Sequence, residues 1–503
     1  MNKRLKDIIT FNAIFIFSQI LMFNSRVFPQ INNTWNKTFG TELYDDANNI
    51  VNTSDNGYIL VGTSQNQSSN SRNMFIVRTD SVGDTIWTKR IGENNWAEGR
   101  ALIKDKKDEF LAAGEYYSNS NDVWVIKFNE IGNILWEEVY QTDSMETVSS
   151  IVSSGDSSFV LVGSTQYWPP NSDVIASELL LMKIDSLGNQ VWLRNYIKDS
   201  LWVWNVGRDV KKTSDGGFII VAESNSFNSG GSAIWLLKTD SVGDTIWTKL
   251  YYKEDSQNVV RSIHQTLDGG YIIGGMVKQF GNHKFNAWII KTNDIGDIIW
   301  ERLYGNIETS EGANALIQLE DSTYVFTGYT SGFPETPSDL WLVKLNVQGD
   351  TIWTKSIGGM QSDNGNDLVQ SSEGGYAIAG RTKSFGAGGY DAWLVKTDSS
   401  GNVVVSIDER IYTSIPNEFA LMPNFPNPFN PMTNISYSLP VSGDVTLIIY
   451  NLLGEEVTRL VDGFRAAGEY NSTWDASNFA SGIYFYRLQA GDFVQTRKIM
   501  LLK

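Results

Sequence analysis

The sequence repeats itself with a period of about 53 residues. One position of the repeat is a tryptophan in seven copies and a valine in the eighth. These copies are Trp35, Trp87, Trp136, Trp192, Trp247, Trp300, Trp353 and Val405. The 370 residues from the first copy to the last therefore hold seven periods. Self-similarity at this spacing is typical of an array of supersecondary units, so it constrains the fold more than any other feature of the chain.

Other positions keep the same register. A glycine precedes the marker position by four residues at Gly83, Gly132, Gly188, Gly243, Gly296, Gly349 and Gly401. A run resembling W-L-V-K ends in a basic residue at Arg78, Lys127, Lys183, Lys238, Lys291, Lys344 and Lys396. Each period contains four short strand candidates, separated by turn signals such as DGG at 215–217 and DSVGD at 80–84.

Several of these strand candidates are apolar on both faces, for example FVLV at 159–162 and FIIV at 218–221. A strand with one wet face would alternate, so these strands are expected to be buried on both sides, as in a blade stacked between two others. Four strands in about 50 residues, repeated seven times, predict an all-β chain with a seven-bladed β-propeller over 26–405. An open β-solenoid remains the alternative, and the extra copy of one strand leaves open which chain end would close the ring.

In a sheet of antiparallel strands, successive connections emerge on opposite sides of the sheet. The long, irregular connections share one side, at 92–99, 115–121, 164–177, 198–205, 276–286 and 381–390. Binding residues concentrate on loops that a rigid scaffold displays, so we expect a ligand site on this side. The candidates are aromatic residues outside the repeat register, namely Tyr116, Tyr117, Tyr167, Trp168, Trp202, Trp204, Phe280 and Phe285. They fit either platforms for a sugar or peptide, or anchors that hold the loops down.

Composition limits the chemistry. The chain has no cysteine, which excludes disulfides and cysteine-ligated metals, and its only histidines are His264 and His283. A formal net charge of −17 argues against nucleic acid or an anionic membrane as the main partner. We find no catalytic constellation and predict a non-enzymatic binding or interaction module for an extracellular glycan or protein. The alternative is a secreted carbohydrate-active enzyme with its site on the long-loop side.

Aspartates recur at two fixed positions of the repeat, where they could serve as metal ligands or as catalytic carboxylates. Asp80, Asp185, Asp240 and Asp398 recur at one turn position, where they could hold calcium but more simply bond to the turn backbone. Asp122, Asp339 and Asp391 precede a tryptophan by two residues and could form carboxylate pairs for glycoside chemistry. Asn73, Glu178, Ala233 and Asn286 occupy the same slot in other repeats, which favours loop caps over catalysis. We therefore assign no cofactor.

The N-terminus is typical of a secretory signal peptide. Lys3, Arg4 and Lys6 precede an apolar stretch of 16 residues at 8–23, which is short for a membrane span. We assign residues 1–25 to this signal. No second apolar segment of spanning length follows, so we expect no transmembrane helix in the mature chain and export through the periplasm.

After Val405 the repeat stops. Residues 406–420 read as a linker, and 421–503 contain short alternating strands behind the proline-rich PNFPNPFNP block at 423–431. Several motifs occur here in order, carried by Asn427, Pro428, Phe429, Asn430, Pro431, Gly454, Trp474, Asp475, Gly482, Tyr484, Lys498 and Lys503. The segment resembles the type A C-terminal sorting domain of the type IX secretion system. That resemblance implies a small Ig-like β-sandwich, the type IX secretion machinery as partner, and a secreted or cell-surface destination.

Overall fold

The computed structural model describes residues 34–502, except for 67–70, 93–94, 119, 143, 169–174, 197–203, 226–230, 280, 282–283, 306–308, 332–336, 404–418, 425, 442 and 466–467. The signal segment predicted at 1–25 and the eighth repeat copy at Val405 lie outside these residues. The described chain is all β, as predicted. Within the described ranges, no helix has the length and apolar character needed to cross a membrane.

The repeats form sheets of four antiparallel strands, and consecutive strands along the chain are neighbours in each sheet. The first three sheets are β2 (Asp45–Asn52), β3 (Tyr58–Gln65), β4 (Arg72–Thr79) and β5 (Thr85–Ile91); β6 (Trp96–Lys104), β7 (Glu109–Tyr117), β8 (Asn121–Asn129) and β9 (Ile134–Tyr140); and β10 (Met145–Ser153), β11 (Phe159–Tyr167), β12 (Ala176–Ile184) and β13 (Gln190–Tyr196). Each repeat sheet ends on its tryptophan strand, which lies at the outer edge.

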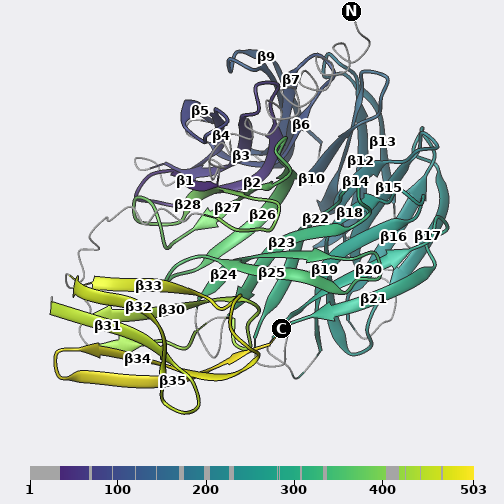
Figure 1. Cartoon of the computed structure of the whole chain (residues 1–503). Helices are drawn as coiled ribbons and strands as arrows, with labels where there is room; N and C mark the ends of the chain where they lie inside the picture. Colours follow the sequence, from purple (N-terminus) through teal and green to yellow (C-terminus); the bar gives the residue numbers. More distant parts are fainter. Residues whose placement is uncertain are drawn as a thin grey trace, which may run out of the picture.

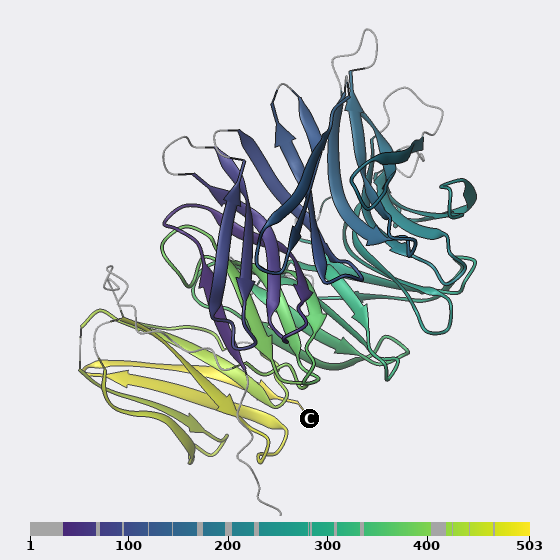
Figure 2. The same cartoon turned by 90° about the horizontal axis from the view of Figure 1, so that it is seen from above.

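Three further sheets follow the same plan. They are β14 (Asn205–Lys212), β15 (Phe218–Ser224), β16 (Ala233–Thr239) and β17 (Thr245–Tyr251); β18 (Ser256–Gln265), β19 (Tyr271–Gln279), β20 (Asn286–Thr292) and β21 (Ile298–Tyr304); and β22 (Glu311–Gln318), β23 (Tyr324–Ser331), β24 (Ser338–Leu345) and β25 (Thr351–Ile357). The sheets stand around a common axis like blades (Figures 1 and 2). The first strand of each sheet contacts the first strand of the next, and β26 (Asp363–Gln370) contacts β2.

The last repeat sheet combines the two ends of the repeat region. β26, β27 (Tyr376–Thr382) and β28 (Asp391–Thr397) are completed by β1 (Trp35–Phe39), the first described strand of the chain. Trp35 pairs with Lys396 and Phe39 with Ala392 in an antiparallel register. The N-terminal strand therefore supplies the outer edge of the last sheet, which answers the question that the eight sequence copies left open.

Burial on both faces explains why the strands are continuously apolar. Every residue of β15 and β16 is buried. The apolar clusters lie between sheets, and one of them joins Phe39, Ala392 and Leu394 of the last sheet to Ile50 and Leu60 of the first. Each sheet thus hides its two faces against its neighbours, which is where most of the stabilising free energy of burial arises.

The repeated tryptophan and glycine form a contact between consecutive sheets. A Cβ atom added to Gly349 would lie 2.9 Å from the Trp300 ring of the preceding sheet, and one added to Gly83 would lie 2.4 Å from Trp35. Trp300 Nε1 also donates to the Val347 oxygen at 3.0 Å. The same glycine–tryptophan contact recurs in the other repeats, at Gly132, Gly188, Gly243, Gly296 and Gly401. These tryptophans are half-buried rather than fully buried, because they cover a turn at the rim of the ring.

A buried or half-buried basic residue pairs with an acidic turn residue in every repeat. Lys238 Nζ lies 2.8 Å from Asp215 and Lys291 Nζ lies 2.9 Å from Asp268. The equivalent pairs are Arg78–Asp55, Lys127–Asp105, Lys183–Asp156, Lys344–Asp321 and Lys396–Glu373. Lys291 also donates from Nζ to the backbone oxygen of Thr292, at the end of its strand, at 2.8 Å. The lysine of the W-L-V-K run is therefore structural.

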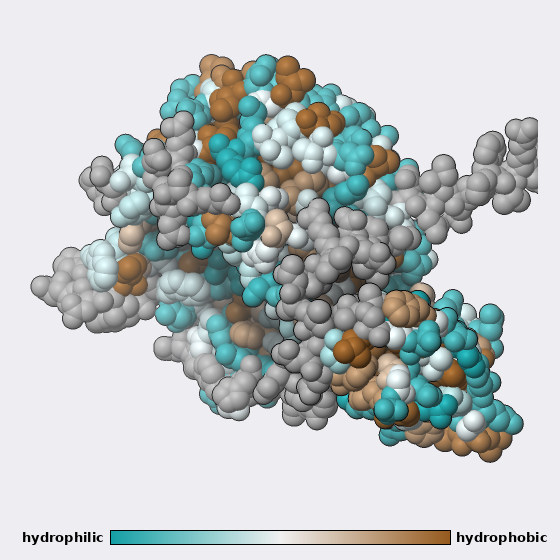
Figure 3. All heavy atoms as spheres, turned by 90° about the vertical axis from the view of Figure 1, so that its left-hand side faces the viewer, coloured by the Kyte–Doolittle hydropathy of each residue, from teal (hydrophilic) through white to brown (hydrophobic). Residues whose placement is uncertain are grey.

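The C-terminal region forms two sheets beside the ring (Figures 1 and 2). One contains β29 (Ala420–Leu421), β30 (Met432–Leu439) and β33 (Gly468–Asp475), and the other contains β32 (Glu456–Arg465), β31 (Gly443–Tyr450), β34 (Gly482–Ala490) and β35 (Phe493–Leu501). They share one apolar core that includes Leu447, Tyr486 and Ile499. On the side of the molecule drawn in Figure 3, apolar and polar side chains are interspersed.

Candidate functional site

Of the eight aromatic residues predicted on the long-loop side, the six that the structure describes are spread over several sheets. Tyr116, Tyr117 and Tyr167 lie at the ends of strands, because backbone pairing continues past the apolar run. Tyr116 packs against Trp124 with ring centroids 5.3 Å apart, and Phe285 lies under Lys278 at 4.9 Å. Trp168, Tyr117 and Trp204 are exposed, while Trp202 and Phe280 lie outside the described residues.

The structure brings together a different set of residues, which begins with a β-bulge in every innermost strand. In β6, for example, the pairing register shifts between Gly99 and Ala101, so Arg100 is the extra residue. The bulge residues of the seven sheets between 35 and 397 are Asn48, Arg100, Ser149, Arg208, Arg261, Asn314 and Asn366. All of them lie on the strands nearest the axis.

The bulge residue has two roles in different sheets. Where it is asparagine, it ties one sheet to the next: Asn48 Nδ2 donates to the Gly99 oxygen at 2.8 Å and Asn366 Nδ2 to the Ala47 oxygen at 3.0 Å. Arginine replaces it in β6, β14 and β18. Its longer side chain reaches acidic and aromatic residues around the axis, so these three sheets depart from the structural pattern at the same position.

We call Tyr44, Arg72, Trp96, Glu98, Arg100, Arg208, Glu223, Arg261, Arg381 and Tyr390 the axial cluster. Tyr44 directly precedes β2, Tyr390 ends the long connection before β28, and Arg72 and Trp96 begin β4 and β6. The cluster therefore lies at the axis on the long-loop side, where the sequence predicted a ligand site.

One part of the cluster is centred on Glu98. Arg72 Nη1 donates to Glu98 Oε1 at 2.5 Å, and Trp96 Nε1 donates to the same oxygen at 3.1 Å. Arg100 bonds to the other carboxylate oxygen of Glu98. The Arg72 guanidinium lies over the Trp96 ring at 4.6 Å from its centroid. One buried carboxylate thus holds two guanidiniums in place beside an exposed indole.

The neighbouring part of the cluster joins the last sheet to the first. Arg381 Nη1 donates to the Tyr44 hydroxyl at 2.7 Å, and that hydroxyl donates to Asp46 Oδ2 at 2.9 Å. The Tyr44 and Tyr390 rings meet edge to face at 5.8 Å, and the Arg381 guanidinium lies 4.9 Å from the Tyr390 centroid. Aromatic faces and cations alternate here, an arrangement that stabilises both.

Glu223 organises the rest of the cluster. Arg208 bonds to both of its carboxylate oxygens at 3.1 Å, and Arg261 Nη1 lies 3.6 Å from Glu223 Oε1. The side chains of Arg261 and Arg100 remain 38% and 39% exposed. Arg100 Nε also lies 3.6 Å from Glu115 Oε1, so three glutamates pair with four arginines, and each guanidinium has more N–H groups than these contacts use.

Burial and charge set the protonation of this region. Burial would raise the pKa of Glu98, but Arg100 and Arg72 hold it below its usual range. Burial and the adjacent Asp46 raise the pKa of Tyr44 to about 12. Tyr44 is therefore a neutral hydrogen-bond donor at neutral pH. The cluster offers fixed donors and stacking faces, which suit ligand recognition rather than proton transfer.

The acidic residues that were weighed for glycoside chemistry bond to nearby backbone or hydroxyl groups. Asp391 Oδ2 accepts from the Ala387 amide at 2.9 Å, Asp339 Oδ2 from Ser356 Oγ at 2.8 Å, and Asp122 Oδ1 from Ser120 Oγ at 3.0 Å. The turn aspartates also bond to backbone, as Asp240 Oδ1 accepts the amides of Val242 and Asp244. Across the described residues no group of three or more His, Cys, Asp or Glu side chains is placed to hold a metal ion.

One of these carboxyls predicts how stability depends on pH. Burial, together with repulsion from Asp363, raises the pKa of Asp339 to about 7. A pKa raised by folding contributes stability that is present at low pH and lost as pH rises through 7. We expect Asp339→Asn to stabilise the protein by about 2–4 kcal/mol at pH 8 and by little at pH 4. Urea unfolding across this pH range measures the difference.

Asp80→Asn is the matched control for that experiment, because Asp80 caps an exposed turn and asparagine fills the same role at Asn129. It should change stability by the same small amount at both pH values. Equal effects of Asp339→Asn at pH 4 and pH 8 would show that the native carboxyl titrates normally.

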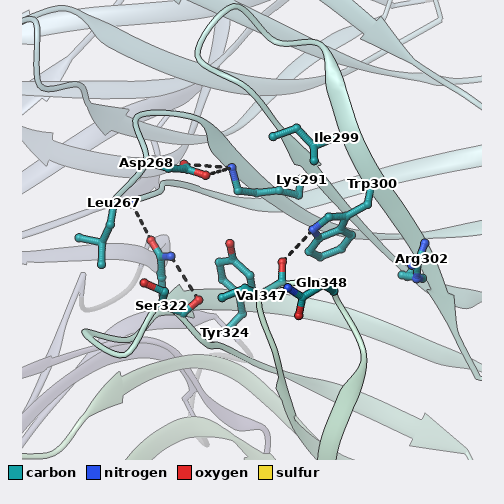
Figure 4. A pocket seen from close by; sticks show the side chains of 11 residues that line it. Leu267, Asp268, Lys291, Ile299, Trp300, Arg302, Ser322, Tyr324, Val347 and Gln348 are labelled. Carbon is teal, nitrogen blue, oxygen red and sulfur yellow. Dashed lines mark hydrogen bonds and ion pairs between the residues drawn. The ribbon is translucent and has the colours of Figure 1, made fainter.

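A hollow of about 530 Å³ opens on the opposite side of the ring, between the sheets that contain β21 and β25. Figure 4 shows that polar groups in it bind one another: Lys291 pairs with Asp268, and Trp300 donates to the Val347 oxygen. The Gln318 side-chain oxygen also accepts the Leu267 amide. We interpret this hollow as the groove between two sheets.

The residues of the C-terminal motif lie in the two C-terminal sheets. Phe429 is buried, exchanges backbone hydrogen bonds with Met500 and Leu502, and packs against Trp474 at 5.3 Å. Asn427 Oδ1 accepts the Met500 amide at 2.9 Å. The block that contains Pro428, Asn430 and Pro431 therefore lies along β35, which carries Lys498. The Trp474 ring also lies 5.2 Å from the Tyr484 ring. Asp475 ends β33, Gly482 begins β34, and Gly454 lies in the turn between β31 and β32 with a positive φ. Lys503 is outside the described residues.

The sequence of this region matches a known family. Residues 424–502 match the family described as secretion system C-terminal sorting domain. No curated protein matches the chain.

Solved structures resemble the chain only in the course of the backbone. A protein of unknown function from Dyadobacter fermentans is 11% identical, with a TM-score of 0.43, over 72% of this chain and 98% of that one. PorZ is an essential bacterial surface component of the type IX secretion system of Porphyromonas gingivalis. It is 8% identical, with a TM-score of 0.24, and the match covers 93% of this chain and 100% of PorZ. These similarities say nothing about a ligand or an activity. The sorting-domain match does identify the route: the chain is a type IX secretion cargo with a C-terminal sorting domain, exported to the cell surface or the extracellular space.

Proposed function

We propose that this cargo is a non-enzymatic binding module in which a seven-bladed β-propeller within 26–405 displays a ligand site and an Ig-like sorting domain at 421–503 directs export. The strand pairing supports the ring, because β1 joins β28 and the innermost strands contact one another in a complete circuit. Two packed antiparallel sheets around one core support the Ig-like arrangement.

The observation that carries the binding role is the axial cluster. At the bulge position, where three sheets have an asparagine that donates to the next sheet, three other sheets have an arginine. Fastening the ring does not require them, since Asn48, Asn314 and Asn366 perform that role with one hydrogen bond each. Exposed guanidiniums that are held by shared carboxylates form a preorganised recognition surface.

Binding to arrays of glycans and extracellular proteins tests this role. We expect the exported protein to bind a ligand without converting it, and Trp96→Ala with Arg261→Gln to abolish that binding at unchanged melting temperature. Arg302→Gln is the control, because Arg302 lies on the outer strand β21 and donates to the backbone oxygen of Glu301 at 3.1 Å. Release of new reducing ends from a polysaccharide would contradict the non-enzymatic role and favour a carbohydrate-active enzyme.

A further inference from the structure

We propose that the axial cluster binds a carboxylate-bearing polysaccharide, an inference that rests on its proposed role as the ligand site. The first argument is charge. The chain carries a net charge of −17, yet five of the nine arginines between residues 35 and 397 belong to the axial cluster. These five arginines outnumber the three glutamates that pair with them, Glu98, Glu115 and Glu223, and the excess positive charge attracts anions.

The second argument is the hydrogen-bonding capacity that remains in the cluster. Glu98 is shared by Arg72 and Arg100, and Glu223 is shared by Arg208 and Arg261, while Glu115 Oε1 also lies 3.6 Å from Arg100 Nε. Arg381 donates from Nη1 to a neutral phenol, the Tyr44 hydroxyl, and not to a carboxylate. A guanidinium presents a planar fork of N–H donors that matches a carboxylate in two parallel hydrogen bonds. A ligand carboxylate would fill this capacity.

The third argument concerns the body of the ligand. Trp96 and Tyr117 are directly opposite each other in the β6–β7 pairing, so their side chains lie on the same face. They are 43% and 49% exposed. Arg72 lies over one face of the Trp96 ring. Flat amphipathic rings beside cations suit a sugar ring that carries a carboxylate, because the ring needs an apolar platform and the carboxylate needs the fork.

The shape of the cluster favours a polymer over a single acid. Its arginines come from β4, β6, β14, β18 and β27, so they are distributed around the axis instead of converging on one point. A chain with a carboxylate on successive sugar units could meet several of them together, and each further contact would add to the affinity.

The test is calorimetric titration of the full exported protein with oligogalacturonate and with its methyl ester, which has the same sugar units without free carboxylates. An oligomannuronate and a polyglutamate peptide extend the comparison to another uronate and to an acidic peptide. We expect the uronates to bind, the ester to bind about 10- to 100-fold more weakly, and higher salt to weaken the acid form more than the ester.

Variants connect binding to the cluster. Arg381→Gln and Trp96→Ala should each weaken uronate binding about tenfold or more, while Arg302→Gln should leave it unchanged. Melting temperatures confirm that each variant is folded.

Failure of this inference differs from failure of the binding role. Equal binding of acid and ester, absence of uronate binding, or stronger binding of polyglutamate would overturn the polysaccharide assignment. If Trp96→Ala combined with Arg261→Gln still abolished binding of a ligand found on the arrays, the binding role would stand without the polysaccharide assignment. Uronate binding that none of the cluster variants changes would overturn both.

Discussion

A chain that ends at Val405 should accumulate in the periplasm of a bacterium that possesses the type IX system. Export across the outer membrane depends on the sorting domain that residues 424–502 form, whereas we expect passage into the periplasm to depend on the signal predicted at residues 1–25. We expect nearly complete loss of the protein from the surface and the medium. Immunoblots of periplasmic, surface and medium fractions measure this distribution.

Two controls separate sorting from folding. The truncated protein should keep its melting temperature, because its sheets bury their apolar faces against one another. Conversely, residues 404–503 fused to a periplasmic reporter should carry the reporter out, since the C-terminal sheets share a core of their own. Normal export of the truncated chain would contradict the sorting role.

Trp300→Ala should destabilise the repeat region by about 3 kcal/mol. The substitution removes a half-buried indole that covers the turn of the next sheet and donates to the Val347 oxygen. It also removes the edge-to-face contact with Tyr324 at 6.2 Å. Because the ring is partly exposed, the cost lies at the lower end of the range for large aromatic truncations. Urea unfolding followed by circular dichroism measures it.

A pair of glycine variants isolates this contact. Gly349 and Gly374 have φ values of 83° and 85°, so alanine strains the backbone equally at both. Only at Gly349 would the new methyl group meet a tryptophan ring, whereas nothing lies within 4 Å at Gly374. Gly349→Ala should therefore be more destabilising than Gly374→Ala by about 1–2 kcal/mol. Equal effects would mean that the ring does not pack on the turn.

The repeat register predicted the β architecture because it records packing. Gly349 keeps its place because Trp300 of the preceding sheet leaves no room for a side chain, and Lys291 keeps its place because Asp268 bonds to it. Both partners recur at fixed spacing, so both appear in the sequence. The C-terminal motif was legible for a similar reason, since Phe429 and Trp474 form one local core.

The axial cluster was not predicted, because its members are far apart in the chain and differ between repeats. Arg381 meets Tyr44 across 337 residues. One signal was available: Arg100, Arg208 and Arg261 occupy one repeat position that holds asparagine in three other sheets. A charged residue inside an otherwise apolar register marks a departure from the structural pattern. Aromatic residues on loops do not reveal this signal, because the three arginines lie within strands.

The central claim is that the N-terminal strand closes the ring, and a designed disulfide tests it most directly. The natural chain has no cysteine, so Lys37→Cys with Leu394→Cys introduces the only pair. These residues are partners in the β1–β28 register, within reach of a disulfide, whereas Lys37→Cys with Ala392→Cys is out of register and serves as the control. Mass spectrometry of the unreduced, folded protein should find the 37–394 bond in most molecules and little of the control bond. Free thiols at 37 and 394 would show that β1 does not pair with β28 and that the ring is open or closed by another strand.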